Sequence, residues 1–186
     1  INGLSQLERE YKLYLPLYDG TTKVEIGIES GSTITKPAED KKLPIVFYGT
    51  SILQGGCASR PGMVFTSIIS RKLNVDCINF GYSGNGKMDP PMAELISDIK
   101  ASFYVIDCLP NMTAKEVTDS VIPLATAIRG KNPKTPIVFV ENVEYTRAIF
   151  QASLKKNMDE KNQALKIEFD KLVRGGMKDL DYISAA

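Results

Sequence analysis

The chain has 186 residues, of which 43% are hydrophobic, and this length suffices for one well-packed core. Its 23 basic and 22 acidic residues nearly cancel, so we expect no nucleic-acid partner and no electrostatic attraction to an anionic membrane. The absence of histidine excludes a complete Ser-His-Asp or Cys-His catalytic site, and a histidine-ligated zinc, within these residues.

The cysteines and the apolar runs narrow the class of protein further. Cys57, Cys77 and Cys108 are odd in number and widely spaced, which favours neither a disulfide framework nor a metal-binding knuckle. We interpret each as a small, buried apolar residue. The longest apolar runs, such as 137–140, are far too short to cross a bilayer, so we expect a soluble protein without a membrane span.

The N-terminal part of the chain has its own pattern. Tyrosine and leucine alternate over 11–17, and valine and isoleucine alternate over 24–28, with an Asp-Gly pair between the two segments. This alternation is typical of a β-hairpin or of two antiparallel strands. Residues 31–42 are polar, and we interpret them as a linker with a domain boundary near residue 40.

After this boundary, short apolar runs alternate with helical patterns. The apolar runs, which predict strands, lie at 45–48, 77–80, 103–106, 137–140 and 180–183. Apolar residues at helical spacing predict helices over 64–73, 92–99, 113–128 and 157–173. One of them starts with Thr113 and Glu116, the spacing of a capping box. The alternation predicts an α/β fold, a three-layer αβα sandwich around a parallel sheet of about five strands.

The segments that follow the first three strands carry the candidate site, because ligands of parallel sheets bind outside the carboxyl ends of the strands. Ser51 follows the first strand directly and could expose its hydroxyl and its N–H. A glycine-rich turn, 81–86, follows the second strand. Asn111, a neutral hydrogen-bond donor, follows the third. Asp107 has no second carboxylate at ligand spacing, so we predict no metal.

Each segment also has a purely structural interpretation. Ser51 could cap a helix, the glycine turn could be a flexible connection, and Asn111 could be a turn residue after proline. For the last two, taken alone, this interpretation is the stronger one. Three such segments at three successive strand ends nevertheless converge on one crevice, which favours a functional site.

The order of these segments resembles the SGNH (GDSL-like) hydrolase family. The resemblance is carried by YGTSILQGGCASRPG at 48–62, GYSGNG at 81–86 and DCLPN at 107–111, and it covers roughly residues 44–183. These segments look like a bacterial branch in which a small β domain precedes the hydrolase domain. The resemblance implies a flavodoxin-like fold, with 1–40 as the end of the preceding β domain plus linker and 41–186 as the hydrolase domain.

The resemblance also implies roles for individual residues. Ser51 matches the family nucleophile, and its N–H, the N–H of Gly84 and the side-chain amide of Asn111 match the three oxyanion donors. Thr50 stands where the commonest family motif has aspartate. Thr50, Arg60 and Glu141 are further candidates for contact with substrate. The family motif gives Arg60 no role, and for Arg60 and Glu141 an ordinary surface or loop position is the stronger interpretation.

One family segment has no counterpart here. Family members carry an Asp-x-x-His segment late in the chain, whose histidine is the general base for the serine. This chain begins with Ile1 rather than Met and stops after the apolar run 180–183, so we expect a fragment whose histidine lies beyond Ala186. The alternative is a relative that lacks the segment altogether. In either case we expect the 186 residues alone to be nearly inactive.

The resemblance therefore implies a serine esterase that hydrolyses carboxylic esters, such as O-acetyl groups on carbohydrates, without a cofactor. It suggests a bacterial protein that is secreted or periplasmic, although the unpaired cysteines are also compatible with the cytoplasm. A non-catalytic relative that binds an acylated carbohydrate is the alternative. A nucleotide-binding protein shares the architecture but ranks last, because the glycines do not form a dinucleotide fingerprint.

Overall fold

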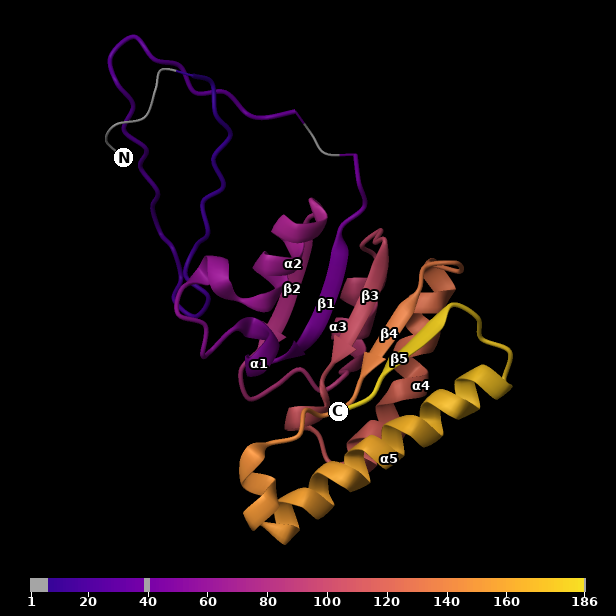
Figure 1. Cartoon of the computed structure of the whole chain (residues 1–186). Coiled ribbons are helices and arrows are strands. Elements are labelled where there is room, and N and C mark those ends of the chain that lie inside the picture. Colours follow the sequence, from indigo (N-terminus) through magenta and orange to yellow (C-terminus); the bar gives the residue numbers. More distant parts are fainter. Residues whose placement is uncertain (1–6, 39–40, 186) are drawn as a thin grey trace.

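The computed structural model describes residues 7–38 and 41–185 (Figure 1). At its centre is a five-stranded parallel sheet in the order β2-β1-β3-β4-β5. The strands are β1 (Ile45–Thr50), β2 (Cys77–Tyr82), β3 (Phe103–Asp107), β4 (Ile137–Val140) and β5 (Leu180–Ile183). Each strand contains one of the predicted apolar runs, so the predicted parallel α/β sheet is confirmed.

Helices connect the strands and lie on both sides of the sheet. They are α1 (Ser51–Gln54), α2 (Phe65–Leu73), α3 (Pro90–Ser97), α4 (Ala114–Lys131) and α5 (Ala152–Arg174). Short 3-10 turns are η1 (Pro61–Met63), η2 (Leu109–Asn111) and η3 (Thr146–Phe150). The predicted capping box of α4 is formed, since Glu116 N donates to Thr113 Oγ1 at 3.2 Å and Thr113 N donates to Glu116 Oε2 at 2.6 Å.

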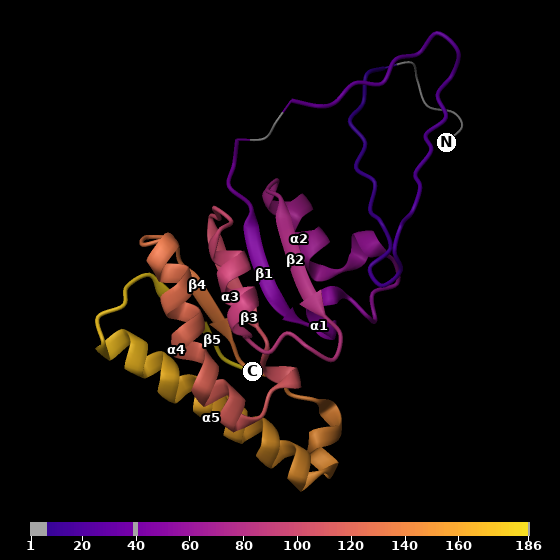
Figure 2. The ribbon, with the colours of Figure 1, turned by 180° about the vertical axis from the view of Figure 1, so that it is seen from behind.

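The sheet buries its two faces unequally (Figures 1 and 2). Val46, Tyr48 and Phe139 belong to the larger core, which α3, α4 and α5 complete. On the other face, Ile45, Phe47 and Leu53 form a smaller core beneath α2. This second helical layer lies on the β1–β2 side of the sheet, whereas near β5 Val140 is only half-buried and Ile183 is 52% exposed. The helical layer on one face of the sheet is therefore complete, whereas the layer on the other face covers only the part formed by β1 and β2.

The N-terminal residues differ from the prediction. The structure assigns no strand within 7–38, so the antiparallel pair predicted over 11–17 and 24–28 is wrong. The segment instead runs as an extended loop that reaches α1 and α2 (Figure 1). Its side chains contact those helices rather than each other: Lys12 Nζ lies 3.0 Å from Asp76 Oδ1, and Arg71 Nη1 donates to Tyr14 Oη at 3.1 Å. The boundary predicted near residue 40 falls at residues 39–40, outside the described residues.

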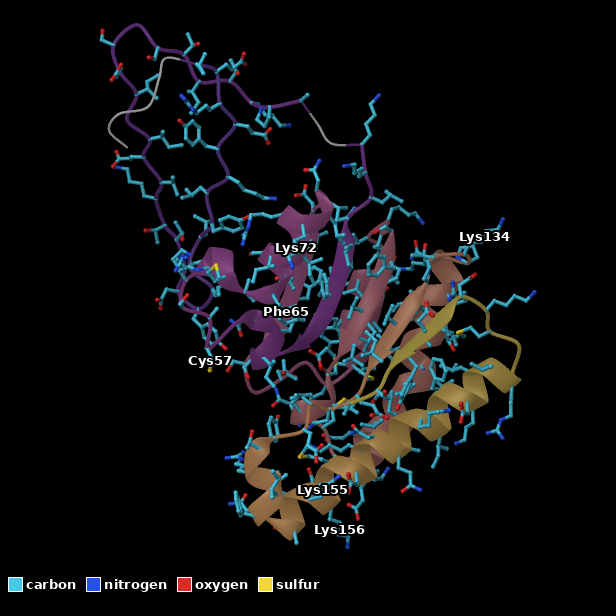
Figure 3. All side chains as sticks on the ribbon, in the orientation of Figure 1. Cys57, Phe65, Lys72, Lys134, Lys155 and Lys156 are labelled. Atoms are coloured by element: carbon cyan, nitrogen blue, oxygen red, sulfur yellow. The ribbon has the colours of Figure 1, made fainter. Side chains whose placement is uncertain are left out.

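The cysteines also depart from the prediction. Cys108 is fully buried and Cys77 is half-buried, but Cys57 is exposed, so the expectation of a buried cysteine is wrong there. Figure 3 shows Cys57 at the outer edge of the loop that leads from α1 toward α2. Within 7–38 and 41–185 no helix has the length and apolarity needed to cross a bilayer.

Backbone segments at the ends of β1 and β2 lie so close together that some positions require glycine. A Cβ added at Gly81, the fifth residue of β2, would lie 2.2 Å from the backbone nitrogen of Gln54 in α1. A Cβ at Gly86 would lie 2.1 Å from the carbonyl oxygen of Gly49 in β1. Backbone atoms cannot yield as a flexible side chain can, so these contacts fix α1 and the turn after β2 against the end of β1.

We therefore predict that Gly81→Ala destabilises the fold by about 3 kcal/mol, because the added methyl forces α1 away from β2. Gly130→Ala is the matched control, since Gly130 lies within α4 and a Cβ there meets nothing within 4 Å. This control is expected to be neutral or to stabilise the protein by up to about 1 kcal/mol. Urea unfolding of the two variants measures both effects. Equal stability of Gly81→Ala and the wild type would contradict the proposed contact.

Candidate active site

The candidate site lies where three strand ends meet. Because β1 lies between β2 and β3, Thr50 pairs with Tyr82 on one side and Gly49 pairs with Asp107 on the other. The segments that follow these three strands therefore start from the same edge of the sheet. This is the point at which the strand order reverses, where α/β sheets commonly bind ligands.

Ser51 is the first residue of α1 and follows β1 directly. Its side chain is half-buried, and its hydroxyl has no hydrogen-bond partner among the described residues. The preceding residue, Thr50, is fully buried, and its hydroxyl accepts a hydrogen bond from Ile52 N at 3.4 Å. The side chain of Thr50 thus caps the serine-bearing helix and is turned away from solvent, which leaves the serine hydroxyl available.

The glycine-rich turn after β2 has a tightly defined shape. Gly84 and Gly86 have φ angles of 70° and 75°, in the left-handed region that favours glycine. Asn85 N donates to Tyr82 O at 3.1 Å and closes the turn. A Cβ at Gly84 would meet nothing within 4 Å, so this residue borders open space. In the described part of the chain, no group accepts a hydrogen bond from Gly84 N.

Asn111 is the last residue of η2, after β3, and it contacts the glycine-rich turn. Its Nδ2 donates to Asn85 O at 2.6 Å, which leaves the second hydrogen of the amide free for another acceptor. From the other side, the buried Lys161 of α5 donates through Nζ to Pro110 O at 3.4 Å. Burial lowers the pKa of Lys161 below its usual value. Asn111 is therefore held by the turn, and the residue before it, Pro110, is held by α5.

The predicted residues Ser51, Gly84 and Asn111 are thus linked through their segments. Gln54, at the other end of α1 from Ser51, accepts a hydrogen bond through Oε1 from Ser83 N at 2.9 Å. Together with the bond from Asn111 to Asn85, this contact fastens the glycine-rich turn on both sides of Gly84. Gln54 could not be singled out from the sequence alone, because no motif marks a glutamine in a four-residue helix.

The other two sequence candidates occupy different environments. Arg60 is exposed at the start of η1, and among the described residues its guanidinium has no hydrogen-bond or ion-pair partner. Glu141 follows β4, and both of its carboxylate oxygens accept hydrogen bonds from the fold, from Tyr182 Oη at 2.5 Å and from Ala185 N at 2.7 Å. Glu141 therefore fastens the end of β5, and its oxygens are already engaged.

A mainly apolar hollow of about 290 Å³ lies beside the serine-bearing helix. It is lined by Ser51, Ile52, Gly55, Gly56, Cys57, Ala58, Met63, Val64 and Phe65. Ile52 and Met63 are substantially exposed, whereas Val64 is buried and forms part of the wall. Phe65 is braced by an edge-to-face contact with Phe47, with 6.0 Å between the ring centres. Figure 3 labels Phe65, so that its position near α1 can be followed.

The sequence of the chain matches models of known protein families. Residues 41–186 match the sequence model of the GDSL-like Lipase/Acylhydrolase family, which is most of the chain. The chain belongs to this family. Residues 1–34 match a second family model, described as the N-terminus of Esterase_SGNH_hydro-type. A search of curated proteins finds no significant match.

The solved structure of a GDSL-like protein agrees with this assignment, and two further solved structures share the fold. A GDSL-like lipase from Bacteroides ovatus is 38% identical, with a TM-score of 0.88, over 93% of this chain and 51% of that chain. Salicylyl-acyltransferase SsfX3, from a tetracycline biosynthetic pathway, is 20% identical with a TM-score of 0.69, over 84% of this chain and 46% of its own. A family two carbohydrate esterase from Clostridium thermocellum, solved with cellohexaose, is 16% identical with a TM-score of 0.60, over 80% of this chain and 56% of its own.

The sequence identities and the aligned shares of each chain limit what can be concluded for this chain. The chain spans about half the length of these three solved structures. Below 25% identity, the acyltransferase and the carbohydrate esterase indicate the fold alone. The GDSL-like family and its α/β fold, expected from the resemblance, are confirmed. The roles of individual residues stay predictions.

Asp107 is an ionisable group at the edge of the sheet where the candidate site lies. Within the described ranges, no three Cys, Asp or Glu side chains lie close enough to hold a metal ion. The carboxyl of Asp107 lies at the carboxyl end of β3, and burial raises its pKa to about 6. The folded chain therefore binds this proton more tightly than the unfolded chain does. Stability accordingly falls as pH rises from about 4 to about 6.

We predict that Asp107→Asn stabilises the protein at pH 7, because it removes the cost of the buried charge. The gain is roughly 1 to 3 kcal/mol at pH 7 and vanishes near pH 4, where the wild-type carboxyl is protonated in the folded state. Urea unfolding at the two pH values measures it. Asp181→Asn is the matched control, because it makes the same substitution on the exposed side of β5. An equal gain at both pH values would contradict the assignment.

Proposed function

We propose that this chain forms the nucleophile-bearing part of a serine esterase whose histidine base comes from residues outside 1–186. The observation that carries the proposal is the linkage of Ser51, the Gly84 turn and Asn111 at one edge of the sheet. The serine hydroxyl and the Gly84 N–H have no partners among the described residues, as a nucleophile and an oxyanion donor require. Membership of the GDSL-like family supports the same activity.

In the proposed reaction, Ser51 Oγ attacks the carbonyl carbon of an ester, and the histidine accepts the serine proton. The carbonyl oxygen becomes an oxyanion, which accepts hydrogen bonds from Ser51 N, Gly84 N and Asn111 Nδ2. The tetrahedral intermediate then collapses, the ester C–O bond breaks, and the alcohol leaves with the proton from the histidine. Water hydrolyses the acyl-serine by the same sequence of steps. The reaction needs no cofactor.

The proposed substrate is an ester with a small acyl group, such as an O-acetyl group on a carbohydrate. The hollow of about 290 Å³ beside Ser51 is mainly apolar, which suits an acyl group rather than a sugar. The carbohydrate part of the proposal is supported by the fold shared with a carbohydrate esterase solved with cellohexaose. Arg60, exposed and without an ion-pair partner in the described ranges, is available to a polar leaving group.

We further propose that residues 1–40 end a preceding β domain and that 41–186 belong to the hydrolase domain. The matches of two different family models to 1–34 and 41–186 support this division. Exposed apolar side chains of the N-terminal segment, such as Tyr11 and Ile26, would then pack against the rest of that domain.

Substitutions in the full-length protein test the catalytic roles. Ser51→Ala should reduce kcat/KM for p-nitrophenyl acetate by about 10⁴-fold or more, because it removes the nucleophile. Asn111→Ala should reduce it by about 100-fold or more through loss of one oxyanion donor, with the fold intact. Asn157→Ala, at an exposed position of α5, is the matched control and should behave as wild type. Full turnover by Asn111→Ala would remove Asn111 from the site.

A second experiment tests the source of the base. The 186-residue chain should hydrolyse p-nitrophenyl acetate about 10⁴-fold more slowly than the full-length protein, because a serine without its histidine is a poor nucleophile. Substantial Ser51-dependent hydrolysis by the 186 residues would contradict this mechanism. A full-length protein that lacks hydrolysis but binds an acetylated carbohydrate would instead favour the non-catalytic alternative.

A further inference from the structure

Gln54 connects three separate parts of the molecule. Its backbone ends α1, the helix that starts with Ser51. Its Oε1 accepts a hydrogen bond from Ser83 N, in the glycine-rich turn, at 2.9 Å. Its Nε2 donates to Leu17 O, in the N-terminal segment, at 3.0 Å. Both ends of one planar amide are therefore engaged, and each binds a different segment of backbone.

The helix that carries Gln54 has little freedom to move. The close approach of Gly81 to Gln54 N fixes its last residue against β2. Gly55, which follows, has a φ angle of 99° and ends the helix, and its N–H returns to Ser51 O at 3.0 Å. Because α1 is a single turn, the positions of Ser51 and Gln54 are coupled to each other.

The bond to Ser83 acts immediately before Gly84. On the other side of Gly84, Asn111 Nδ2 holds Asn85 O at 2.6 Å. Two side-chain amides, one from α1 and one from η2, thus fix the backbone on either side of the Gly84 N–H. A left-handed glycine with open space around it could otherwise adopt several conformations, so these two bonds select one of them.

The N-terminal segment supplies the second anchor of Gln54. Besides the bond from Gln54 to Leu17 O, Tyr18 Oη donates to Ser51 O at 3.4 Å. The side chain of Leu17 also lies close to Gly55, within 2.8 Å of where a Cβ would stand. Farther along, Tyr14 stacks with Arg71 of α2, with 5.5 Å from the guanidinium to the ring centre. The segment therefore contacts the serine-bearing helix at several points.

We propose that Gln54 is a positioning residue of the oxyanion hole, which locks the Gly84 turn to the serine-bearing helix, with the N-terminal segment at Leu17 as its second anchor. This inference rests on the proposed function for its catalytic meaning. Oxyanion donors act only when they are preorganised at the correct distance, so freeing the turn lowers the rate of the chemical step more than it weakens substrate binding. The N-terminal segment is thereby a structural part of the candidate site.

Two variants separate the two hydrogen bonds of Gln54. Gln54→Met keeps a similar length and removes both bonds. Gln54→Glu keeps an acceptor for Ser83 N but loses the donor to Leu17 O. Gln163→Met and Gln163→Glu are matched controls, because Gln163 is exposed on α5 and its side chain has no hydrogen-bond partner among the described residues. Thermal unfolding checks that each variant is folded.

The first measurement is amide hydrogen exchange of Ser83 in the full-length protein, a readout that does not depend on activity. Gln54→Met should accelerate this exchange by about 10-fold or more, whereas Gln54→Glu should stay near the wild-type rate. Unchanged exchange in Gln54→Met would overturn the proposed lock, whatever the protein catalyses.

The second measurement is steady-state hydrolysis of p-nitrophenyl acetate by the full-length protein. Gln54→Met should lower kcat by about 10- to 100-fold with KM within about two-fold of wild type, and Gln54→Glu should restore most of the loss. Wild-type kcat in Gln54→Met, together with faster exchange of Ser83, would overturn the positioning role. An equal loss of kcat in both variants would overturn the proposal that Gln54 acts through its hydrogen bond with Ser83 N. The loss would then be due to the contact with Leu17.

The two measurements also distinguish this inference from the proposed function. If wild-type protein and Ser51→Ala are equally inert, the esterase proposal fails, and with it the catalytic meaning of Gln54. The exchange of Ser83 would then still decide whether Gln54 holds the turn.

Discussion

The position of β1 between β2 and β3 is the constraint on which the candidate site depends. In a parallel sheet this order sends the segments after neighbouring strands to a single edge, and here it brings together a serine, a glycine turn and an asparagine from distant parts of the sequence. The hydrophobic core lies directly beneath this edge: Val46 and Tyr48 of β1 pair with Tyr104 and Ile106 of β3, and all four side chains belong to the larger core. The polar site is therefore positioned by the apolar contacts beneath it.

Short-range polar contacts refine what the sheet positions only approximately. Thr50 caps the serine-bearing helix, Gln54 joins this helix to the glycine turn, and Asn111 holds the same turn from the opposite side. Each contact uses a neutral side chain, so the arrangement does not depend on the ionisation of those groups. Lys161, the buried cation beneath Pro110, is the exception, and its lowered pKa reflects the cost of placing a charge there.

Most of the sheet could be predicted, because each of the five strands contains a short apolar run and parallel strands need helical crossovers. The strand ends then led to Ser51, the glycine-rich turn and Asn111 as candidates, and the family resemblance singled out Gly84 within the turn. The short helix α1 could not be predicted, since four residues contain no helical period. The alternation over 11–17 was misleading, because strand pairing requires a partner that alternation alone does not identify. Gln54 was missed for a similar reason: its importance comes from two backbone groups that are distant in sequence.

The approach of backbone to backbone at Gly49, Gly81 and Gly86 has a consequence for how such a site can diversify. At these glycines any added side chain would collide with backbone atoms, so a substitution breaks the fold. These positions therefore cannot change gradually. The side chains around the neighbouring hollow, such as Ile52, Met63 and Phe65, are partly exposed and are not constrained in this way. Under the proposed function, substitutions at the rim of the hollow should therefore alter the preference for ester substrates, whereas substitutions at the strand ends should misfold the protein.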